Sequence, residues 1–421
     1  MPLGVFLRST DGVAEPPVES TYYPTGITTL YPQIAVEIDF ATAPGDTPRT
    51  WTNVTENVRN VSYSRGGRTH ELQRTDAGTL TCVLDNRTGD YDPTNTGGAY
   101  YPNVKRMRWI RVMAKWGSVE YPRWAGLIES WQQDWPSGGA DATVVVRAVD
   151  AFKILALYDL GGQSFPEALS GDRVAAVLAA VNVPYSADTG NTTIVASDDP
   201  ISVGTKALGH LQDVVESENG LLFADRSGEI VFQDRAWRNT NAQALTSVAT
   251  IGDAGGTEIP YRAGTLDSDD AEVWPTVEVT PSGGTAETAY DAASRANHYD
   301  RVLTRSILSS SQTEALAAAQ WLSRLYADPS PRIPQVELLP QNYVASWPTV
   351  LGIENSQRFT WIRRAAATIQ QDVFVERVAE SASPGRGWTI SVQFSPASDQ
   401  TYWLLGSAGF SELGETTYAG Y

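Results

Sequence analysis

The sequence predicts a mainly β fold whose middle part is α/β. Three observations predict it. Polar and apolar residues alternate along short runs between 34 and 155, helical apolar spacing replaces this alternation at 170–181 and 205–220, and alternating runs return after 256. A period of two is typical of half-buried strands, and a period near 3.6 is typical of amphipathic helices. The chain therefore divides into a β part, an α/β part and a second β part.

The first β part, 34–155, follows an N-terminal extension, 1–33. Its alternating runs are bounded by Gly, Pro, Ser or Asn, which favour turns. Several short strands separated by turns are typical of an antiparallel barrel or sandwich. The predicted strands are IAVEIDF (34–40), TLTCVLD (79–85), RWIRVMAKW (108–116), PRWAGLIESWQQDW (122–135) and ATVVVRAVDAF (142–152).

The middle part, 156–255, is predicted to be a small α/β domain with two helices and a hairpin. Helices are expected over 170–181 and 205–220, where apolar residues recur at helical spacing, and Asn-Gly at 219–220 is a typical helix stop. The hairpin is expected over 221–235, because two apolar runs flank a turn sequence that contains Gly.

The second β part, 256–400, is predicted to contain one helix at 311–328. Ser311 and Glu314 have the spacing of a capping box at its start. Its apolar face is expected to hold Leu316, Ala319, Leu322 and Tyr326. Strands are expected over 272–281, 335–340, 372–381 and 387–396. A C-terminal arm, 401–421, is aromatic and rich in Gly, without a period, and is expected to need a partner surface to bury Trp403, Leu404 and Phe410.

Composition describes a folded chain with an acidic surface. Its 421 residues carry a net charge of −18 and are 42% hydrophobic, which suits two to four globular domains. The acidity disfavours specific nucleic-acid binding. The one basic cluster, 105–111, alternates with apolar residues and predicts a half-buried strand with a cationic outer face. No run is long and apolar enough for a membrane-spanning segment, and no secretory signal is expected.

The stretch CVLDNRTGDYDPTN, 82–95, raises the question of a metal site. Its carboxylates do not fit the calcium-loop spacing, because position 5 from Asp85 is Gly89 and position 12 from Asp90 is Tyr101. Asp90 and Asp92 also lack the contrasting environments that separate the pKa values of a catalytic pair. The stretch therefore predicts a turn, with Gly89 at a positive φ.

Catalytic, cofactor-binding and metal-binding residues are predicted to be absent. Cys82, the only cysteine, lies in an apolar strand pattern and is expected in the core, and the three histidines are too far apart for a zinc site. No P-loop, metalloprotease or serine-hydrolase motif is present. His210 is expected to be a partly buried or exposed helix residue. The acidic run Asp267, Asp269 and Asp270 is expected to be a solvated loop.

Tryptophan is unusually frequent, with thirteen residues. A cluster in the first β part could form a sugar-stacking platform, but on alternating strands these side chains are better explained as core and subunit-interface anchors. The cluster is Trp109, Trp116, Trp124, Trp131 and Trp135.

Three stretches resemble minor tail proteins of long-tailed, siphovirus-type phages of actinobacteria. In LDNRTGDYDPTN (84–95), LDN, a Gly-Asp turn and a DP-x-N element follow a strand. In ALGHLQDVVESENGLLFADRSGEIVFQDR (207–235), a helix runs into a hairpin that ends in an aromatic-x-x-Arg sequence. The stretch VERVAESASPGRGWTISVQFSPA (375–397) is similar to the closing strands of that family. Their order and spacing carry the resemblance, which lies between residues 84 and 397.

The resemblance implies a baseplate hub protein of the tail tip. Such proteins have two tube-like antiparallel β-barrel domains that flank a smaller domain, and three copies form a ring that closes the tail tube. It implies a homo-oligomer, a trimer, in contact with the distal tail protein, the tape measure protein and other minor tail proteins, with DNA passing without specific binding. The expected location is the virion tail tip, after synthesis in the host cytoplasm.

Several alternatives to a structural, non-enzymatic hub remain open from the sequence. One is a carbohydrate-binding tail module that uses the tryptophans for receptor recognition. Another is a cryptic wall hydrolase, which is disfavoured because the sequence shows no acid–base or nucleophile constellation. The sequence does not separate a three-fold from a six-fold ring. If a ring encloses DNA, its bore is expected to be acidic; the other explanation of the charge is solubility of the free subunit.

Overall fold

The computed structural model describes residues 21–68, 72–264, 272–328, 333, 335–365 and 367–397, with the backbone of Thr401–Tyr402 and Thr417–Tyr418. Most of the predicted arm, 401–421, and residues 1–20 of the predicted extension lie outside this description, as do His70 and the acidic run Asp267, Asp269 and Asp270.

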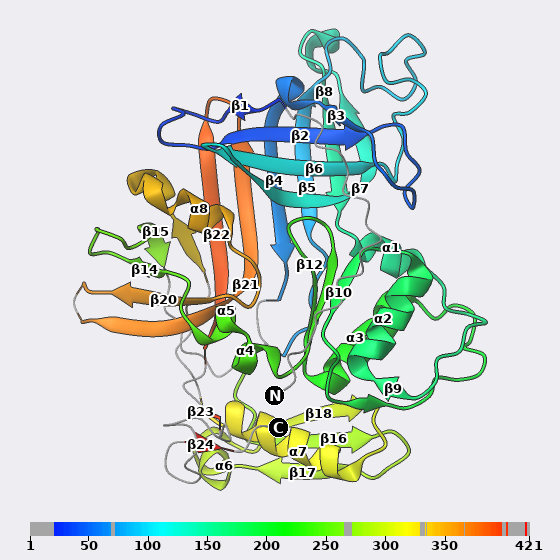
Figure 1. Cartoon of the computed structure of the whole chain (residues 1–421), viewed down its shortest axis with the longest axis vertical. Coiled ribbons are helices and arrows are strands. Elements are labelled where there is room, and N and C mark those ends of the chain that lie inside the picture. Colours follow the sequence, from blue (N-terminus) through cyan, green and yellow to red (C-terminus); the bar gives the residue numbers. More distant parts are fainter. Residues whose placement is uncertain are drawn as a thin grey trace, which may run out of the picture.

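One curled sheet of fourteen strands dominates the molecule (Figure 1). Its order is β1-β2-β6-β7-β8-β5-β4-β21-β22-β19-β15, with β3 on β2, β20 on β21 and β14 on β20; only the β14–β20 pair is parallel. This main sheet confirms the prediction of a mainly antiparallel β fold. Its strands are β1 (Tyr23–Pro24), β2 (Gln33–Asp39), β3 (Trp51–Asn53), β4 (Val58–Gly66), β5 (Thr79–Asp85), β6 (Trp109–Trp116), β7 (Val119–Asp134), β8 (Thr143–Val149), β14 (Thr250–Gly252), β15 (Tyr261–Gly264), β19 (Val336–Leu338), β20 (Arg358–Arg363), β21 (Ile369–Ser383) and β22 (Gly387–Pro396).

The two predicted β parts meet in this sheet through β4 and β21. Their antiparallel register runs from Gly66 opposite Arg377 to Val61 opposite Ala382. One hydrophobic cluster contains residues from both parts, among them Val61, Cys82, Val378 and Trp388. The two parts therefore share a core within one chain, and their arrangement as two separate tube-like barrels stays a prediction.

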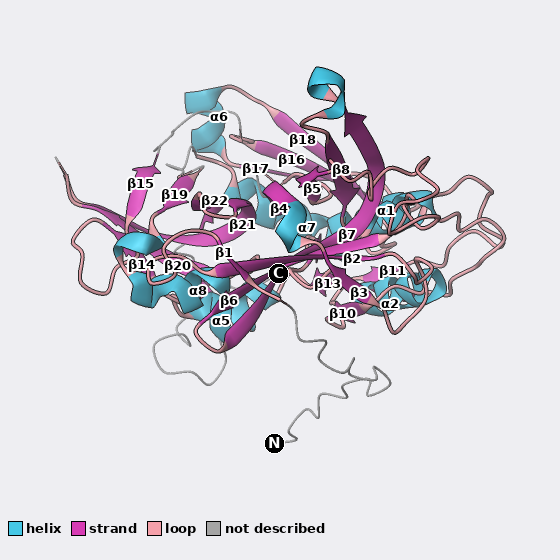
Figure 2. Ribbon diagram, turned by 90° about the horizontal axis from the view of Figure 1, so that it is seen from above, coloured by secondary structure: helices cyan, strands magenta, loops and turns pink. Residues whose placement is uncertain are grey.

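The α/β lobe (152–233) lies beside the main sheet, on the opposite side from β14, β15 and α8 (Figure 2). The predicted helices are present as α2 (Ser170–Val181) and α3 (Ala207–Glu218), which end at Asn182 and Asn219 with φ of 61° and 55°. Asn tolerates this left-handed conformation and so closes a helix. The other elements are α1 (Phe152–Leu157), β9 (Ala168–Leu169), β10 (Tyr185–Ala187), β11 (Thr193–Ile194) and the hairpin strands β12 (Leu221–Ala224) and β13 (Ile230–Gln233).

Residues 276–325 form a small lobe of their own. Here β17 (Glu287–Tyr290), β16 (Thr276–Pro281) and β18 (Val302–Ile307) form a separate sheet, and α7 (Gln312–Leu325) packs on it. The predicted segment 256–400 therefore contributes strands to two sheets, the main sheet and this smaller one. The smaller sheet has its own core, because Val277, Val279 and Ile307 bury the apolar face of α7. That face contains Ala315, Ala318, Ala319, Leu322 and Tyr326; Leu316, predicted on it, is only half-buried.

Short helices complete the described chain. They are α4 (Trp237–Thr240), α5 (Ala242–Leu245), α6 (Ala292–His298) and α8 (Trp347–Leu351). Within the described residues, none of the helices has the length and apolar character needed to cross a membrane.

Candidate functional site: an arginine-lined joint between the lobes

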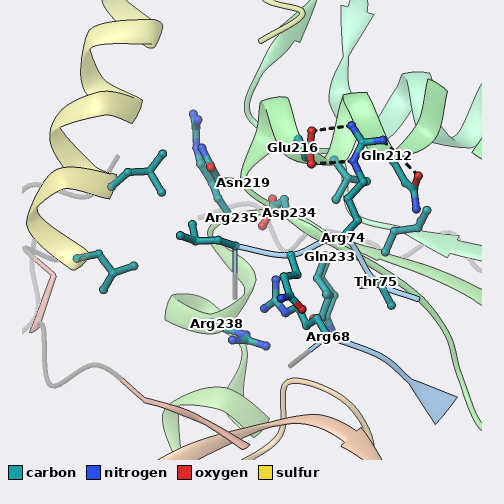
Figure 3. A pocket seen from close by; sticks show the side chains of 18 of the residues that line it. Arg68, Arg74, Thr75, Gln212, Glu216, Asn219, Gln233, Asp234, Arg235 and Arg238 are labelled. Atoms are coloured by element: carbon teal, nitrogen blue, oxygen red, sulfur yellow. Dashed lines mark hydrogen bonds and ion pairs between the residues drawn. The ribbon is translucent and has the colours of Figure 1, made fainter. Parts of the chain in front are cut away.

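A cavity of about 150 Å³ lies where the α/β lobe, the small lobe and the main sheet meet (Figure 3). Helix α3 and the end of β13 form one wall, and α7 forms another. The main sheet contributes Phe374 and Pro396 to the lining. Five arginines from three stretches of the chain line it: Arg68, Arg74, Arg235, Arg238 and Arg305.

The buried carboxylate of Glu376 pairs with two of these arginines, Arg68 and Arg238. In β21, Val375 pairs with Phe394 and Arg377 with Gln393, so Glu376 is the extra residue of a β-bulge. A bulge re-aims a side chain, and the buried carboxylate accepts bonds from Arg68 Nε at 2.6 Å and Ser395 Oγ at 2.6 Å. Arg238 Nη2 lies 2.7 Å away.

Two opposing influences set the pKa of Glu376. Burial, the largest influence, raises the pKa, but the charges of Arg238 and Arg68 and their hydrogen bonds lower it to about 2. The group is therefore a carboxylate at neutral pH, and it holds two arginines from distant segments against β21.

The other arginines of the cavity are also matched by acids or carbonyls. Arg74 forms a bidentate pair with Glu216 of α3, at 2.8 and 2.9 Å, and bonds Asp213 at 2.7 Å. Arg305 donates to the Leu72 carbonyl at 2.8 Å. Arg235 lies 3.9 Å from Glu218 and 3.6 Å from Glu314. These acids and the Leu72 carbonyl offset the positive charge of the arginines where the lobes meet.

A second buried charge pair fixes the centre of the main sheet. Arg123 of β7 and Glu380 of β21 are both fully buried and hydrogen-bonded to each other. The same carboxylate accepts from Tyr63 of β4 at 3.0 Å and from the Trp388 indole of β22 at 2.9 Å. Four strands are therefore joined at one carboxylate.

Arg123 reaches this position because it occupies a bulge. Val112 pairs with Trp124 and Met113 with Pro122, which leaves Arg123 without a partner in the β6–β7 ladder. Burial, the largest single influence, acts to lower the pKa of Arg123, but the charges and hydrogen bonds of Glu380 and Tyr63 together raise it above its ordinary value. The guanidinium therefore stays charged.

Three arginines also form hydrogen bonds with backbone carbonyls at the C-terminal end of α8. Arg123 bonds the Leu351 carbonyl, Arg226 donates to the Gly352 carbonyl at 2.9 Å, and Arg65 to the Ile353 carbonyl at 2.7 Å. Glu354 adds an ion pair to Arg65 at 2.6 Å. Cations suit helix carbonyl ends. Since Arg226 lies in the β12–β13 turn, this contact attaches the α/β lobe to the second β part.

Asp150 lies at the connection from β8 to α1. Its carboxylate accepts bonds from the Gly78 amide and, at 3.0 Å, from the Phe152 amide. Burial raises the pKa of Asp150 to about 7, although both amides act to lower it. The fold therefore favours the protonated form over a pH range in which an unfolded Asp is ionised.

This gives a testable pH dependence. Because the pKa of Asp150 is higher in the folded state, its contribution to the free energy of unfolding is present below about pH 4 and is lost as pH rises to about 7, by on the order of 2–4 kcal/mol. Asp150→Asn should flatten this slope in urea unfolding measured from pH 4 to 8. An unchanged slope in the variant would contradict the assignment.

The stretch 82–95 completes strand β5 at Asp85 and then forms turns, as predicted. The Asn86 side chain accepts from the Tyr91 amide at 3.0 Å, Asn95 donates to the Gly89 carbonyl at 2.9 Å, and Gly89 has φ of 74°. Tyr91 is fully buried and makes stacked ring contacts with Tyr100 and with Trp131. No group of three or more metal-binding side chains occurs in the part of the chain that the structure describes.

Cys82 and His210 both pack against neighbouring side chains. Cys82 is fully buried in the core, as predicted, and burial raises the pKa of its thiol. His210 stacks on Phe165 with ring centroids 6.1 Å apart, and burial, with the Arg173 charge, lowers its pKa.

Comparison with known proteins shows that the fold of this chain is similar to that of solved structures. Neither the protein-family models nor the curated proteins contain a match. Among solved structures, the tail protein from Neisseria meningitidis MC58 has a TM-score of 0.54 at 12% identity, covering 86% of this chain and 96% of its own. The 43 kDa tail protein of prophage MuSo2 from Shewanella oneidensis has a TM-score of 0.51 at 11% identity, covering 86% and 98%.

This chain has the fold of these two tail proteins. At such identities the likeness concerns the fold alone, and it agrees with the predicted resemblance at that level. The actinobacterial host, the siphovirus type and the hub ring stay predictions.

Within this tail-protein fold, the tryptophan cluster does not form an exposed platform. Trp109 and Trp124 are buried, and Trp116 and Trp131 are half-buried. Of the five, Trp135 is the exposed one, at 58%. These positions support the core interpretation and weaken the sugar-stacking interpretation.

Proposed function

We propose that this chain is a structural protein of a phage tail tip, where three copies form a hub ring that closes or extends the tail tube and lets DNA pass on ejection. The observation that carries the proposal is the fold likeness to two tail proteins, which extends over nearly the whole length of each. The finer assignment to a hub of a siphovirus of actinobacteria rests on the three sequence stretches that resemble that family.

The buried charge pairs support a component that keeps its shape during assembly. Glu376 and Glu380 each bring together arginines and polar groups from separate strands, and the Arg226 contact attaches the α/β lobe to α8. The proposal includes no catalytic step, because the arginines and acids of the joint are engaged with one another. Turnover of purified peptidoglycan by the chain would contradict this part.

The proposed neighbours are the distal tail protein, the tape measure protein and other minor tail proteins. Copies are expected to meet through open strand edges, which favour pairing with another chain. DNA would pass through the ring without specific binding, and an acidic bore would repel it over a Debye length of about 8 Å.

Self-association in solution is the first expected result. Native mass spectrometry of the purified chain at high concentration should show a species of three times the 45.6 kDa chain mass. A chain that stays monomeric at every concentration, and that binds glycans on an array, would favour the carbohydrate-binding alternative.

A further inference from the structure

The sheet of the small lobe ends in an open edge at β17. In this three-stranded sheet β16 is central, with β18 on one side and β17 on the other. Strand β17 is the one farthest from the α/β lobe, at the lower boundary of the molecule in Figure 1. Among the described strands, β17 pairs only with β16. Its other edge is therefore available to one more strand.

The backbone groups of Thr288 and Tyr290 point to this free edge. The Asp291 amide donates to the Pro275 carbonyl at 2.9 Å, so the odd-numbered residues of β17 form the hydrogen bonds to β16. Alternate residues of a strand direct their N–H and C=O groups to opposite sides. Thr288 and Tyr290 thus direct theirs away from β16, where a partner strand would bond them.

The edge lacks the features with which proteins commonly protect a strand edge. Proline, lysine and β-bulges are among these features. The sequence of β17 is Glu-Thr-Ala-Tyr, and its register with β16 has no shift. By contrast, β15, at an edge of the main sheet, has a bulge between Tyr261 and Ala263. An unprotected edge favours addition of a strand from another chain.

The face of this sheet opposite α7 presents polar side chains and one tyrosine. Val277 is buried in the core with α7, so its neighbour Glu278 points to the opposite face. On that face Glu278 lies between Thr288 of β17 and Thr304 of β18, which are both exposed. Tyr290 follows on the same face, and 59% of its surface is exposed. A strand added to β17 would continue this face.

The charge of this surface is acidic. Glu278 is half-buried, and no cation in the described part of the chain pairs with it. Between 276 and 300 the chain has four carboxylates and one arginine, Arg295, which pairs with Asp300 at 3.0 Å. A second copy, with its net charge of −18, has the same sign of charge, whereas a basic segment is attracted.

We propose that β17 binds an extended segment of another protein as an added strand, with a Lys or Arg opposite Thr288 that pairs with Glu278. The added strand lies two strand spacings, about 10 Å, from β16. Because the Thr288 side chain between them is short, a long basic side chain can cross it and meet the Glu278 carboxylate. An apolar side chain opposite Tyr290 packs on the exposed ring. This contact concerns the small lobe alone and does not depend on the hub ring.

Hydrogen exchange on the full chain, with an alternating Lys-Val peptide as the probe, tests the proposal. In the free chain the Thr288 and Tyr290 amides should exchange fast. The peptide should slow them about tenfold when its concentration is about ten times the Kd, and an alternating Glu-Val peptide should not. Slow exchange in the free chain would mean that the edge is already covered. That result, no protection by the Lys-Val peptide, or equal protection by both peptides would overturn the proposal.

Variants test the two parts of the contact separately. Glu278→Gln should weaken binding of the Lys-Val peptide by about twofold to fivefold, the effect of an exposed ion pair. Glu287→Gln is the matched control, because Glu287 points to the α7 side, where it accepts from Gln312 Nε2 at 2.8 Å.

Thr288→Pro removes an outward N–H and should abolish peptide binding, whereas Thr288→Val keeps the N–H and should bind. If the proline variant does not fold, the two Glu variants still decide. Equal peptide affinities of Glu278→Gln and Glu287→Gln would overturn the pairing with Glu278.

Discussion

Replacing Arg123 with methionine is expected to lower the free energy of unfolding by about 3–5 kcal/mol, because it leaves the Glu380 carboxylate buried without its cation. Arg123 and Glu380 have fully buried side chains, and the same carboxylate accepts from Tyr63 and Trp388. Urea unfolding of Arg123→Met, Glu380→Gln and the double variant measures the effect. The double variant should be more stable than the sum of the two single changes predicts.

Arg59 provides a matched control for this experiment. It also occupies a bulge, between Val58 and Asn60 of β4, and it pairs with Asp85 and Asp141 at 3.1 and 2.5 Å. Its side chain is 33% exposed, so Arg59→Met should cost less than about 1 kcal/mol. Equal losses at the two positions would show that burial does not strengthen the Arg123 pair.

Glu376→Gln is expected to remove about 3 kcal/mol at pH 7, from the difference between the ordinary Glu pKa and a folded value of about 2. Because the pKa is lower in the folded state, this stability is present above about pH 4.5 and is lost as pH falls toward 2. The difference between the unmodified chain and the variant should therefore narrow in acid, in urea unfolding measured from pH 7 to 3.

Glu120→Gln is the control for the acid series. Glu120 pairs with Lys115 at 3.7 Å, and its side chain is 45% exposed, so the change should have an effect below about 1 kcal/mol at every pH. A difference for Glu376→Gln that stays constant down to pH 3 would mean that the ion pairs with Arg68 and Arg238 do not hold the carboxylate charged.

Helices, turns and buried strand positions could be predicted from the sequence where a single local pattern of residues determines them. The helices α2 and α3 follow apolar spacing with an Asn stop, α7 begins after Ser311, and the turns of 86–95 follow from Asn86 and Gly89. Cys82 alternates with apolar neighbours on its strand and is buried accordingly.

The pairing of the two β parts could not be predicted in this way, because the β4–β21 ladder joins residues more than 300 positions apart. The small lobe was missed for a related reason: β16 and β18 alternate like the strands of the main sheet, but among the described strands they form a separate sheet with β17. The bulge at Glu376 could have been predicted from the sequence Val375-Glu376-Arg377-Val378, where two adjacent charges interrupt the strand alternation. Such an interruption is typical of a bulge.

Electron cryomicroscopy of an intact virion tail that contains this chain tests the central proposal most directly. The account predicts three copies arranged around the tail axis at the tip, with Asp and Glu predominant on the wall that faces the DNA path. Absence of the chain from the tail, or its presence as a single peripheral copy, would contradict the proposed hub. A ring with a neutral or arginine-lined bore would keep the hub and contradict the acidic-bore prediction.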